Sequence, residues 1–235
     1  MDIDNYWYDL DHRLSELVDN SFVKLPSLEQ FELEDVASAI DHEMNGETFS
    51  EGSQPHKNFL ERLGLEKKLT PRLFDIACSR FGYTGEITNQ YHIARRVEPG
   101  NAKEMYRAHF DSHLFTLVLP IKIPECLGEG TIGDLIYFPN ARKHPKSEVI
   151  NFMGKAYYKR FASREGMKRF ALTHKQQIDD FRDYKPLLFI GNTTLHTNKQ
   201  VSIACSSYRL TILAHFFDPS PKYGVGGFLR AIRNR

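Results

Sequence analysis

The sequence predicts one mainly β domain with flanking helices, and three observations support this fold class. With 235 residues, 41% of them hydrophobic, the chain can bury a single large core. From Glu86 onward, short apolar runs alternate with Gly, Pro and Asn turns, which is typical of antiparallel strands. Before Glu86, apolar residues recur with helical spacing. We therefore expect residues 1–85 to form a helical support for a β core over 86–217.

The N-terminal elements are indicated by capping and turn residues. The run Ser-Phe-Val-Lys-Leu predicts a short strand, and Ser27 can cap the helix that follows it. Gly, Ser and polar residues indicate a loop, and Pro71 is expected to divide the helical region after that loop. In order, we expect a strand over 21–25, a helix from Ser27 onward, a loop over 46–56 and helices over 58–81.

Five strands are expected in the β core, at 87–97, 106–123, 134–138, 187–195 and 208–217. The basic segment 141–184 lies between the third and fourth strands. It is too long for a structureless loop in a compact domain, so we expect a mostly helical insert draped over the sheet. Residues 218–235 are expected to form a C-terminal tail, of which 228–235 is either a short amphipathic helix for self-association or a solvated end.

Charge is distributed unevenly along the chain, although the formal net charge is only +1. Residues 1–50 hold thirteen acidic and two basic residues, a balance of −11, and residues 141–185 hold twelve basic and five acidic residues, a balance of +7. Such segregation indicates either solvated helix faces, attraction between two parts of the surface, or contact with a charged ligand. A pI near 7.8 and an acidic N-terminal region argue against a nucleic-acid partner.

The sequence also predicts the cellular compartment of the protein. No apolar run approaches the roughly 18 to 20 residues that cross a bilayer, and the acidic N-terminal stretch differs from a signal peptide. We therefore expect a soluble, cytoplasmic protein with no membrane partner. Cys78, Cys126 and Cys205 stand 48 and 79 positions apart, so we expect reduced, buried packing residues and no disulfide framework.

The triplet His109-Phe110-Asp111 is the first candidate for chemistry. Side chains at i and i+2 of a strand share a face, so His109 and Asp111 can converge on one ion while Phe110 packs behind them. His196, 87 positions later, follows an apolar run that can deliver it to the same place. Two imidazoles and one carboxylate suit an Fe(II) centre that keeps open coordination positions. Alone, His-x-Asp is a weak motif in a chain with ten histidines and thirty acidic residues.

Arg209 opens a strand whose other residues are almost all apolar. A buried guanidinium requires an anionic partner, because desolvating an isolated charge costs several kcal/mol. Its planar fork suits a carboxylate, and Thr211 on the same face can add a hydroxyl. The alternative is an internal pair with an acidic side chain of the chain itself.

The order of these residues resembles the Fe(II)- and 2-oxoglutarate-dependent dioxygenases. His-x-Asp is followed by a distant His and then, thirteen residues further on, by Arg-x-Thr. The resemblance covers residues 86–217 and implies a double-stranded β-helix, or jelly-roll, core. Within the superfamily, Gly133–Lys143 resembles the phytanoyl-CoA dioxygenase-like branch, except that Asn140-Ala141-Arg142 stands where that branch has Gly-Ser-His.

The resemblance also implies roles for individual residues. Iron is expected to bind His109, Asp111 and His196, and the distal carboxylate of 2-oxoglutarate to bind Arg209 and Thr211. Asn89 and Tyr91 resemble an Asn-x-Tyr pair that contacts the same cosubstrate in some members. Cofactors would be Fe(II), 2-oxoglutarate and O₂, with ascorbate as a supporting reductant.

The implied reaction is hydroxylation of an unactivated C–H bond with release of succinate and CO₂. Asp111 stands where related halogenases have a small residue that leaves room for chloride, which favours hydroxylation over halogenation. Desaturation, epoxidation and ring closure stay open. The alternatives are a cupin-like metalloenzyme that does not use 2-oxoglutarate and a non-catalytic jelly-roll binding module.

The remaining histidines and the basic insert raise further possibilities. His113 could line the pocket, pack in the core, or form an HxDxH zinc site, although i and i+4 of a strand stand about 13 Å apart. His92, His144, His174 and His215 have no ligand-like partner in the sequence, so surface or packing roles are expected. The insert, with Arg160 and Arg164, suggests a small anionic or carrier-bound substrate. The sequence does not indicate an oligomeric state.

Overall fold

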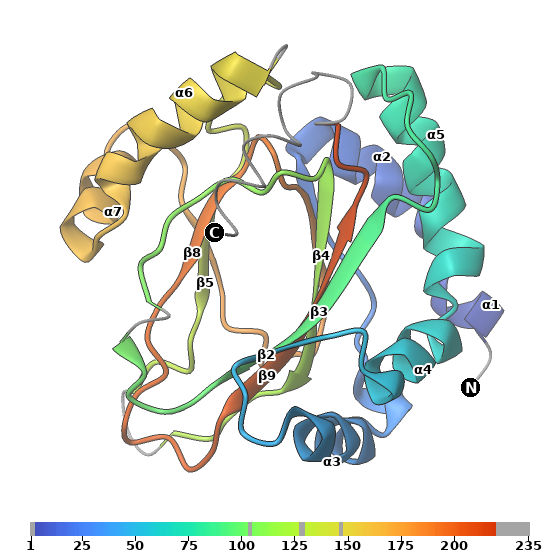
Figure 1. Ribbon diagram of the computed structural model, residues 1–235, viewed down its shortest axis with the longest axis vertical. Coiled ribbons are helices and arrows are strands. Elements are labelled where there is room, and N and C mark those ends of the chain that lie inside the picture. The colour runs from blue at the N-terminus through green and yellow to red at the C-terminus, as the bar shows by residue number, and fades with distance from the viewer. Residues whose placement is uncertain (1–2, 103–104, 127–129, 146–147, 220–235) are drawn as a thin grey trace.

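Two antiparallel sheets face each other in the computed structural model, which describes residues 3–102, 105–126, 130–145 and 148–219 (Figure 1). The larger sheet has the strand order β1-β7-β4-β9-β3-β2, and the smaller has the order β6-β5-β8. The strands are β1 (Phe22–Lys24), β2 (Phe49–Glu51), β3 (Gln90–Val97), β4 (Phe115–Lys122), β5 (Leu135–Phe138), β6 (Gln177–Asp179), β7 (Leu187–Ile190), β8 (Leu195–Asn198) and β9 (Arg209–Phe216).

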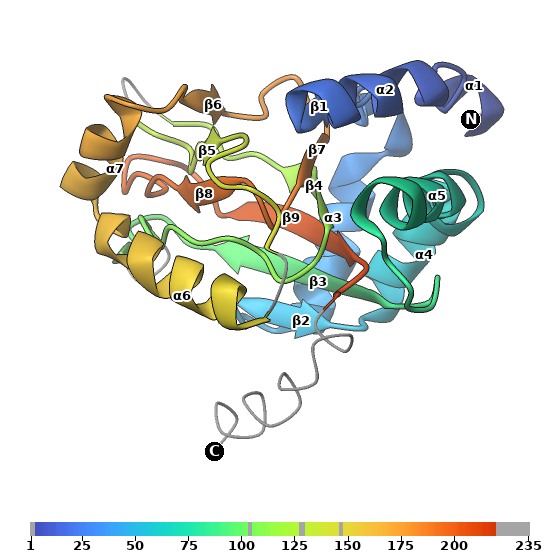
Figure 2. The same cartoon turned by 90° about the horizontal axis from the view of Figure 1, so that it is seen from above.

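Helices cover the outer face of the larger sheet (Figures 1 and 2). They are α1 (Ile3–Tyr6), α2 (Leu10–Asn20), α3 (Leu33–Met44), α4 (Gln54–Arg62) and α5 (Thr70–Phe81), with single turns at Glu29–Phe31 and Leu65–Leu69. Their apolar faces bury Leu17, Ile40 and Leu73 against strand residues such as Leu117 and Ile212. Helices cover one face of β4 and the smaller sheet covers the other, which explains its nearly continuous apolar sequence.

The basic insert covers the smaller sheet on the opposite side of the molecule (Figure 1). It forms α6 (Glu148–Tyr158), a turn at Lys159–Phe161 and α7 (Arg164–Ala171) before it adds β6 to the sheet edge. Met167 and Phe170 of α7 pack on Phe138 of β5, while the charged residues of α7 face outward. The expectation of a helical insert before the last strands is therefore confirmed.

Two predicted strands are shorter than expected, because only part of each predicted range belongs to the larger sheet. The region 106–123 is a strand only from Phe115 onward, and the His-x-Asp triplet precedes it in a segment held by one isolated bridge. The run 187–195 ends at Ile190, where a turn closed by two N–H groups bonding to the Ile190 carbonyl sends the chain to the smaller sheet. His196 accordingly lies inside β8 and not at the end of the predicted strand.

The N-terminal predictions also need correction at their boundaries. The helix expected from Ser27 begins at Leu33, since a 3₁₀ turn and the left-handed residue Glu32 precede it. The expected loop over 46–56 contains the edge strand β2 and the start of α4. The helical region is divided at Leu63-Gly64, where Gly64 has a φ of +73°, and not at Pro71 as expected. Helical structure runs from Leu65 directly into α5, and Pro71 lies within it without breaking it.

The expectation of reduced, buried cysteines is wrong for Cys126 and Cys205, which are not reduced, and only partly right for Cys78, which is free but not buried. Cys126 and Cys205 face each other across an isolated antiparallel bridge and are joined by a disulfide. Cys78 is exposed on α5. Cys126 and Cys205 are 79 positions apart in the sequence, so only the folded structure shows that they are neighbours.

Two further expectations concern the membrane and the tail. None of the helices within the described ranges is long and apolar enough to span a bilayer. The cytoplasmic location stays a prediction. The predicted tail falls largely on residues 220–235, which lie outside the described residues.

Candidate metal and cosubstrate site

The predicted ligands His109 and His196 are joined through their backbones. Each residue donates its N–H to the carbonyl of the other at 3.0 Å, forming an isolated antiparallel bridge. The N–H of Asp111 then donates to the Gly191 carbonyl at 3.1 Å, in the turn between β7 and β8. These bonds hold the His-x-Asp segment against the end of one sheet and the start of the other.

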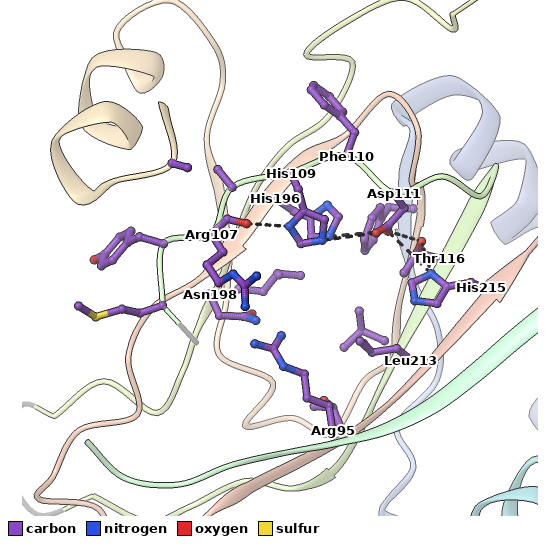
Figure 3. Close-up of a pocket in the computed structure, with 18 of the residues that line it drawn as sticks. Arg95, Arg107, His109, Phe110, Asp111, Thr116, His196, Asn198, Leu213 and His215 are labelled. Carbon is purple, nitrogen blue, oxygen red and sulfur yellow. Dashed lines mark hydrogen bonds and ion pairs between the residues drawn. The ribbon is translucent and has the colours of Figure 1, made fainter. Parts of the chain in front are cut away.

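Backbone carbonyls determine which nitrogen of each histidine is free. His109 Nδ1 donates to the Arg107 carbonyl at 2.7 Å, and His196 Nδ1 donates to the Thr194 carbonyl at 3.2 Å. Both Nε2 atoms therefore carry the lone pair. They face Asp111, at 3.5 Å from Oδ1 for His109 and 3.7 Å from Oδ2 for His196 (Figure 3). A carbonyl that holds the second ring nitrogen is the usual support for a metal-binding imidazole.

The three side chains form a donor set that fits a metal ion. One ligand atom from each of His109, Asp111 and His196 lies within 4.8 Å of the others. Two nitrogens and one carboxylate oxygen leave coordination positions open, which is the donor set of non-haem Fe(II) oxygenases and differs from a closed structural zinc site. His113 does not extend this set, since residues 112–114 form a bend and the strand alternation stops at Asp111.

Asp111 is supported by a hydrogen-bond chain that the sequence did not reveal. Thr116 of β4 donates its hydroxyl hydrogen to Asp111 Oδ2 at 2.5 Å. His215 Nδ1 lies 3.1 Å from the same hydroxyl oxygen and must donate to it, because the only hydroxyl hydrogen is used. Figure 3 shows this chain on the side of Asp111 away from the two histidines.

The charges of the site follow from burial and from these neighbours. Burial alone would raise the pKa of Asp111, but the adjacent imidazoles of His196, His109 and His215 hold it well below its ordinary value. Burial lowers the pKa of His196 to about 4 and also lowers the pKa of His215. Burial also disfavours a charge on His109, but its hydrogen bond to Asp111 and the charge of that carboxylate raise its pKa on balance. At neutral pH Asp111 is therefore ionised and His196 is neutral, which are the forms that bind metals, whereas metal binding at His109 would compete with its proton.

Arg209 is buried as predicted, with 5% of its surface exposed. Among the described residues no carboxylate pairs with it: Asp134 binds Lys199 at 2.8 Å, and Asp179 binds Lys24 at 2.9 Å. Its Nη1 donates to the Gly133 carbonyl, and its buried Nε has no hydrogen-bond partner. Burial and the neighbouring Arg95 lower the pKa of Arg209 to about 10, so it stays charged at neutral pH. The alternative of an internal ion pair is thus not observed in the described part of the chain.

One cavity of about 650 Å³ connects the triad with Arg209. Its wall on the larger sheet is formed by alternate residues of β9, namely Arg209, Thr211, Leu213 and His215. Arg95 of β3, which lies opposite Thr211 in register, also lines it. The predicted partners Arg209 and Thr211 therefore face the same space as His109, Asp111 and His196, and that space is large enough for a small-molecule ligand.

Other predicted site residues lie elsewhere. Asn89 exchanges hydrogen bonds with the backbone of Asp218, and Tyr91, 38% exposed, donates to a carboxylate oxygen of Glu51. His113 stacks on His215 at 5.2 Å. Arg160 stacks over the Tyr157 ring, and Arg164 is exposed at the start of α7. None of these five predicted residues is among the described residues that line the cavity.

Several residues of the site were missed. A surface or packing role was expected for His215, although the i, i+2 alternation of the sequence places it on the same strand face as Arg209. Nothing in the sequence marked the cavity residues Thr116, Arg95 and Arg107, since the inward face of β3 and the bend before β4 become apparent only in the fold.

Comparison with known proteins identifies the fold. No protein-family model matches the chain, and no curated protein matches it by sequence. A prolyl-4-hydroxylase of Pseudomonas putida superposes with a TM-score of 0.52 at 12% identity, over 88% of this chain and 98% of the other. The non-haem α-ketoglutarate-dependent epimerase SnoN of nogalamycin biosynthesis gives 0.55 at 12% identity, over 90% and 84%. The α-ketoglutarate-dependent carbocyclase SnoK of the same biosynthesis gives 0.53 at 12% identity, over 93% and 89%.

These similarities span nearly all of this chain and most of each neighbour. Because the sequence identity is only 12%, they support a common fold and nothing more specific. The phytanoyl-CoA dioxygenase-like branch stays a prediction. The chain has the jelly-roll fold of the Fe(II)- and 2-oxoglutarate-dependent oxygenases, as its sequence predicted.

Proposed function

We propose that the protein is an Fe(II)- and 2-oxoglutarate-dependent oxygenase that hydroxylates a small anionic substrate. The observation that carries the proposal is that a His-Asp-His donor set and a buried arginine without a carboxylate partner among the described residues face one cavity. An iron site alone would fit many metalloenzymes. The arginine adds the need for an anion close to that site, which a cosubstrate with two carboxylates meets.

His109, Asp111 and His196 would hold the iron. Both imidazoles already present Nε2, and Thr116 holds one oxygen of the carboxylate, so little rearrangement of the side chains is required. When bound, the iron and 2-oxoglutarate together activate O₂ and oxidise a C–H bond of the substrate. One oxygen atom would enter succinate and the other the product alcohol, with CO₂ released.

Arg209 and Thr211 would bind the distal carboxylate of 2-oxoglutarate. Both are 5% exposed and lie two residues apart on the cavity face of β9. The guanidinium can donate two parallel hydrogen bonds to a carboxylate, and the hydroxyl can donate a third. This arrangement favours the oxygenase over a cupin-like metalloenzyme that does not use 2-oxoglutarate, because such an enzyme would have no use for Arg209.

Solved structures of similar fold illustrate the range of possible reactions. SnoN has been crystallised with Fe³⁺, α-ketoglutarate and nogalamycin RO, at a TM-score of 0.53 and 11% identity to this chain. It is an epimerase, SnoK is a carbocyclase and the Pseudomonas putida protein is a hydroxylase. We favour hydroxylation over halogenation for this chain because Asp111 supplies a third protein ligand, and epimerisation and ring closure are the alternative outcomes that product analysis would separate.

The decisive measurement is succinate formation from 2-oxoglutarate with Fe(II), ascorbate and O₂, without added substrate. Uncoupled turnover is expected for the wild type and should be abolished in Asp111→Ala. The matched control is Asp180→Ala, since Asp180 is exposed and lies outside the cavity. A wild-type protein that neither binds Fe(II) nor forms succinate would contradict the proposal, as would equal turnover in Asp111→Ala.

A further inference from the structure

Helix α6 turns its apolar face away from the body of the protein. Its apolar residues recur at intervals of three and four, which places them on one side of the helix. In a helix that packs on a core this side is buried, but in α6 it is exposed. The exposed fractions are 62% for Val149, 61% for Phe152, 64% for Met153 and 53% for Tyr157. Val149, Phe152 and Met153 belong to no apolar cluster of the described residues.

The opposite side of α6 attaches the helix to the body through polar groups. Asn151 Oδ1 accepts a hydrogen bond from Arg142 at 2.8 Å, and the Tyr158 hydroxyl donates to a backbone carbonyl at 2.8 Å. Lys155 donates to the hydroxyl of Ser112 at 3.1 Å. The helix is therefore inverted relative to one that packs on a core, because hydrogen bonds hold its inner side and its apolar residues face outward.

Basic residues adjoin this apolar face at its C-terminal end. Residues 149–171 contain six basic residues and one acidic residue, Glu165, which pairs with Lys168 at 2.9 Å. The guanidinium of Arg160 lies over the Tyr157 ring, so one positive charge is directly beside the apolar side chains. An exposed apolar stripe with aromatic residues and neighbouring cations is the pattern of a helix that lies in the interface of an anionic membrane.

The N-terminal part of the chain carries the opposite charge. Residues 1–50 have a balance of −11, whereas the formal net charge of the whole chain is only +1. Their helices α1, α2 and α3 lie on the other side of the molecule from α6 and α7 (Figures 1 and 2). An anionic surface therefore attracts the insert and repels the N-terminal helices, which orients the protein with α6 toward that surface.

A second copy of the chain fits the same face less well. A two-fold contact between α6 helices would bring two basic inserts together, with Glu165 already paired in each. The acidic N-terminal region of another copy would match the charge, but that contact uses two different surfaces and builds rings or open chains instead of a dimer. Residues 220–235 carry four basic residues and no acidic one, so their charge does not complement the insert either.

We propose that the outer face of α6, with the basic residues that follow it, binds the surface of an anionic lipid bilayer. Phe152 and Met153 would enter the boundary between head groups and acyl chains, while Arg160, Arg164 and Arg169 contact anionic head groups. This inference goes beyond the proposed function and does not depend on it. It departs from the expectation of no membrane partner, which rested on the lack of a spanning run and of a signal peptide.

Membrane contact at α6 would bring the cavity close to the lipid surface. Tyr158, Lys159 and Ala162 of the same insert line the cavity. An α-helix with its side chains is about 10–12 Å across, so the cavity and the head groups would lie roughly one helix diameter apart. The proposed surface thus belongs to the part of the molecule that encloses the cavity.

The test is co-sedimentation of the full chain with vesicles of phosphatidylcholine alone or of an equal mixture with phosphatidylserine. The wild type should bind the mixed vesicles, and added salt should weaken this binding. In Phe152→Ser/Met153→Ser the partition coefficient should fall about tenfold or more, because two apolar side chains no longer leave water. In Arg164→Gln/Arg169→Gln it should fall about fivefold or more, because two cations near the surface are removed.

The matched control is Tyr8→Ser/Ile203→Ser, since these apolar side chains are 78% and 84% exposed and lie outside the insert. It should bind as the wild type does. Phe152→Leu/Met153→Leu keeps the face apolar and should also retain binding, which separates loss of the apolar face from misfolding. In Phe152→Trp the emission maximum should move to shorter wavelength when mixed vesicles are added, while the buried Trp7 gives a constant background.

The inference fails if the wild type does not bind the mixed vesicles, or if Phe152→Ser/Met153→Ser binds them as tightly as the wild type. Sedimentation velocity tests the second copy as the occupant. A wild-type dimer that Phe152→Ser/Met153→Ser converts into a monomer, without any binding to vesicles, would assign the face to self-association instead. Succinate formation is measured without vesicles, so each of these results is independent of the proposed function.

Discussion

Thr116 donates its hydroxyl hydrogen to Asp111 Oδ2 at 2.5 Å, which joins the central strand β4 to the irregular segment that precedes the bend at residues 112–114. The donor is 1% exposed and receives a hydrogen bond from His215 of the adjacent strand β9. The orientation of the carboxylate is therefore imposed by the rigid core of the larger sheet. The Asp111 carboxylate is thus held by strand residues, although Asp111 itself does not lie in a strand.

Replacing Thr116 by valine should weaken metal binding with little effect on the fold. Valine has a similar shape and cannot donate to Asp111, so the carboxylate loses the bond that orients it. Loss of such a supporting bond typically lowers metal affinity about 10- to 100-fold. The measurement is the Kd for Fe(II) or Mn(II) by titration, with the free energy of unfolding determined in parallel.

Thr197→Val is the matched control for that change. Thr197 is also a buried strand residue, 2% exposed, and it follows His196, but its hydroxyl has no hydrogen-bond partner. Its removal should leave metal affinity unchanged. Equal losses in both variants would show that Thr116 acts only through packing.

Gly191 should not tolerate a side chain, because the site closes around it. A Cβ at this position would lie 2.6 Å from Thr116 Oγ1 and 3.0 Å from Asp111 Cβ. Gly191→Ala must push apart the hydrogen-bonded pair, and overpacking of this kind costs about 1–3 kcal/mol. We expect a lower melting temperature and weaker metal binding.

Gly154→Ala provides the comparison for Gly191→Ala. Its Cβ would meet only Nη1 of Arg142, at 2.9 Å, which is the end of a flexible side chain. Gly154 lies within α6, where alanine is the better helix former. The variant should be as stable as the wild type or more so. Comparable destabilisation by both substitutions would contradict the argument.

The sequence predicted which residues lie together at the site better than it predicted the local structure that holds them. His109, Asp111, His196, Arg209 and Thr211 meet as expected, because the order and spacing of these residues carry the resemblance to the family. The strand that was to present His109 and Asp111 does not exist at that point. An isolated backbone bridge between His109 and His196 holds these two residues side by side instead.

Residues that support or enlarge the site were not predictable, for physical reasons. Thr116 lies in an apolar strand with both faces buried, where a threonine carries no periodic signal. Arg95 lies in a strand whose residues point alternately toward the helices and toward the cavity. The sequence alone does not show which of these two faces Arg95 is on. Cys126 and Cys205 meet only because the two loops that hold them converge. Contacts between distant segments were thus missed, whereas local patterns were found.

Replacing Arg209 by lysine should separate cosubstrate binding from metal binding. Lysine keeps one positive charge but cannot offer two parallel hydrogen bonds to a carboxylate. We expect the Kd for 2-oxoglutarate of the Mn(II)-loaded protein to rise about tenfold or more, with metal affinity unchanged. Arg182→Lys, at an exposed position, is the control. An unchanged Kd in Arg209→Lys would remove Arg209 from the cosubstrate site.

His92 should contribute to loss of stability in acid. It lies on β3 with its ring against Phe216 at 5.7 Å, and burial lowers its pKa to about 4. An unfolded histidine titrates near 6.5, so between about pH 6.5 and 4 the unfolded chain binds more protons than the native one. The neutral His92 ring therefore makes its full contribution to the free energy of unfolding above about pH 6.5, and this contribution is lost as the pH falls toward 4.

The expected loss for His92 between pH 7 and pH 5 is at most about 2 kcal/mol. Urea unfolding with a chelator present should show a smaller difference between these pH values in His92→Leu than in the wild type. His196 and His113, whose pKa values are also lowered to about 4, titrate with the same sign, so the variant keeps part of the dependence. His12→Leu removes an exposed imidazole and should leave the difference as it is in the wild type. If His92→Leu shows the full wild-type difference, His92 is not held neutral by burial.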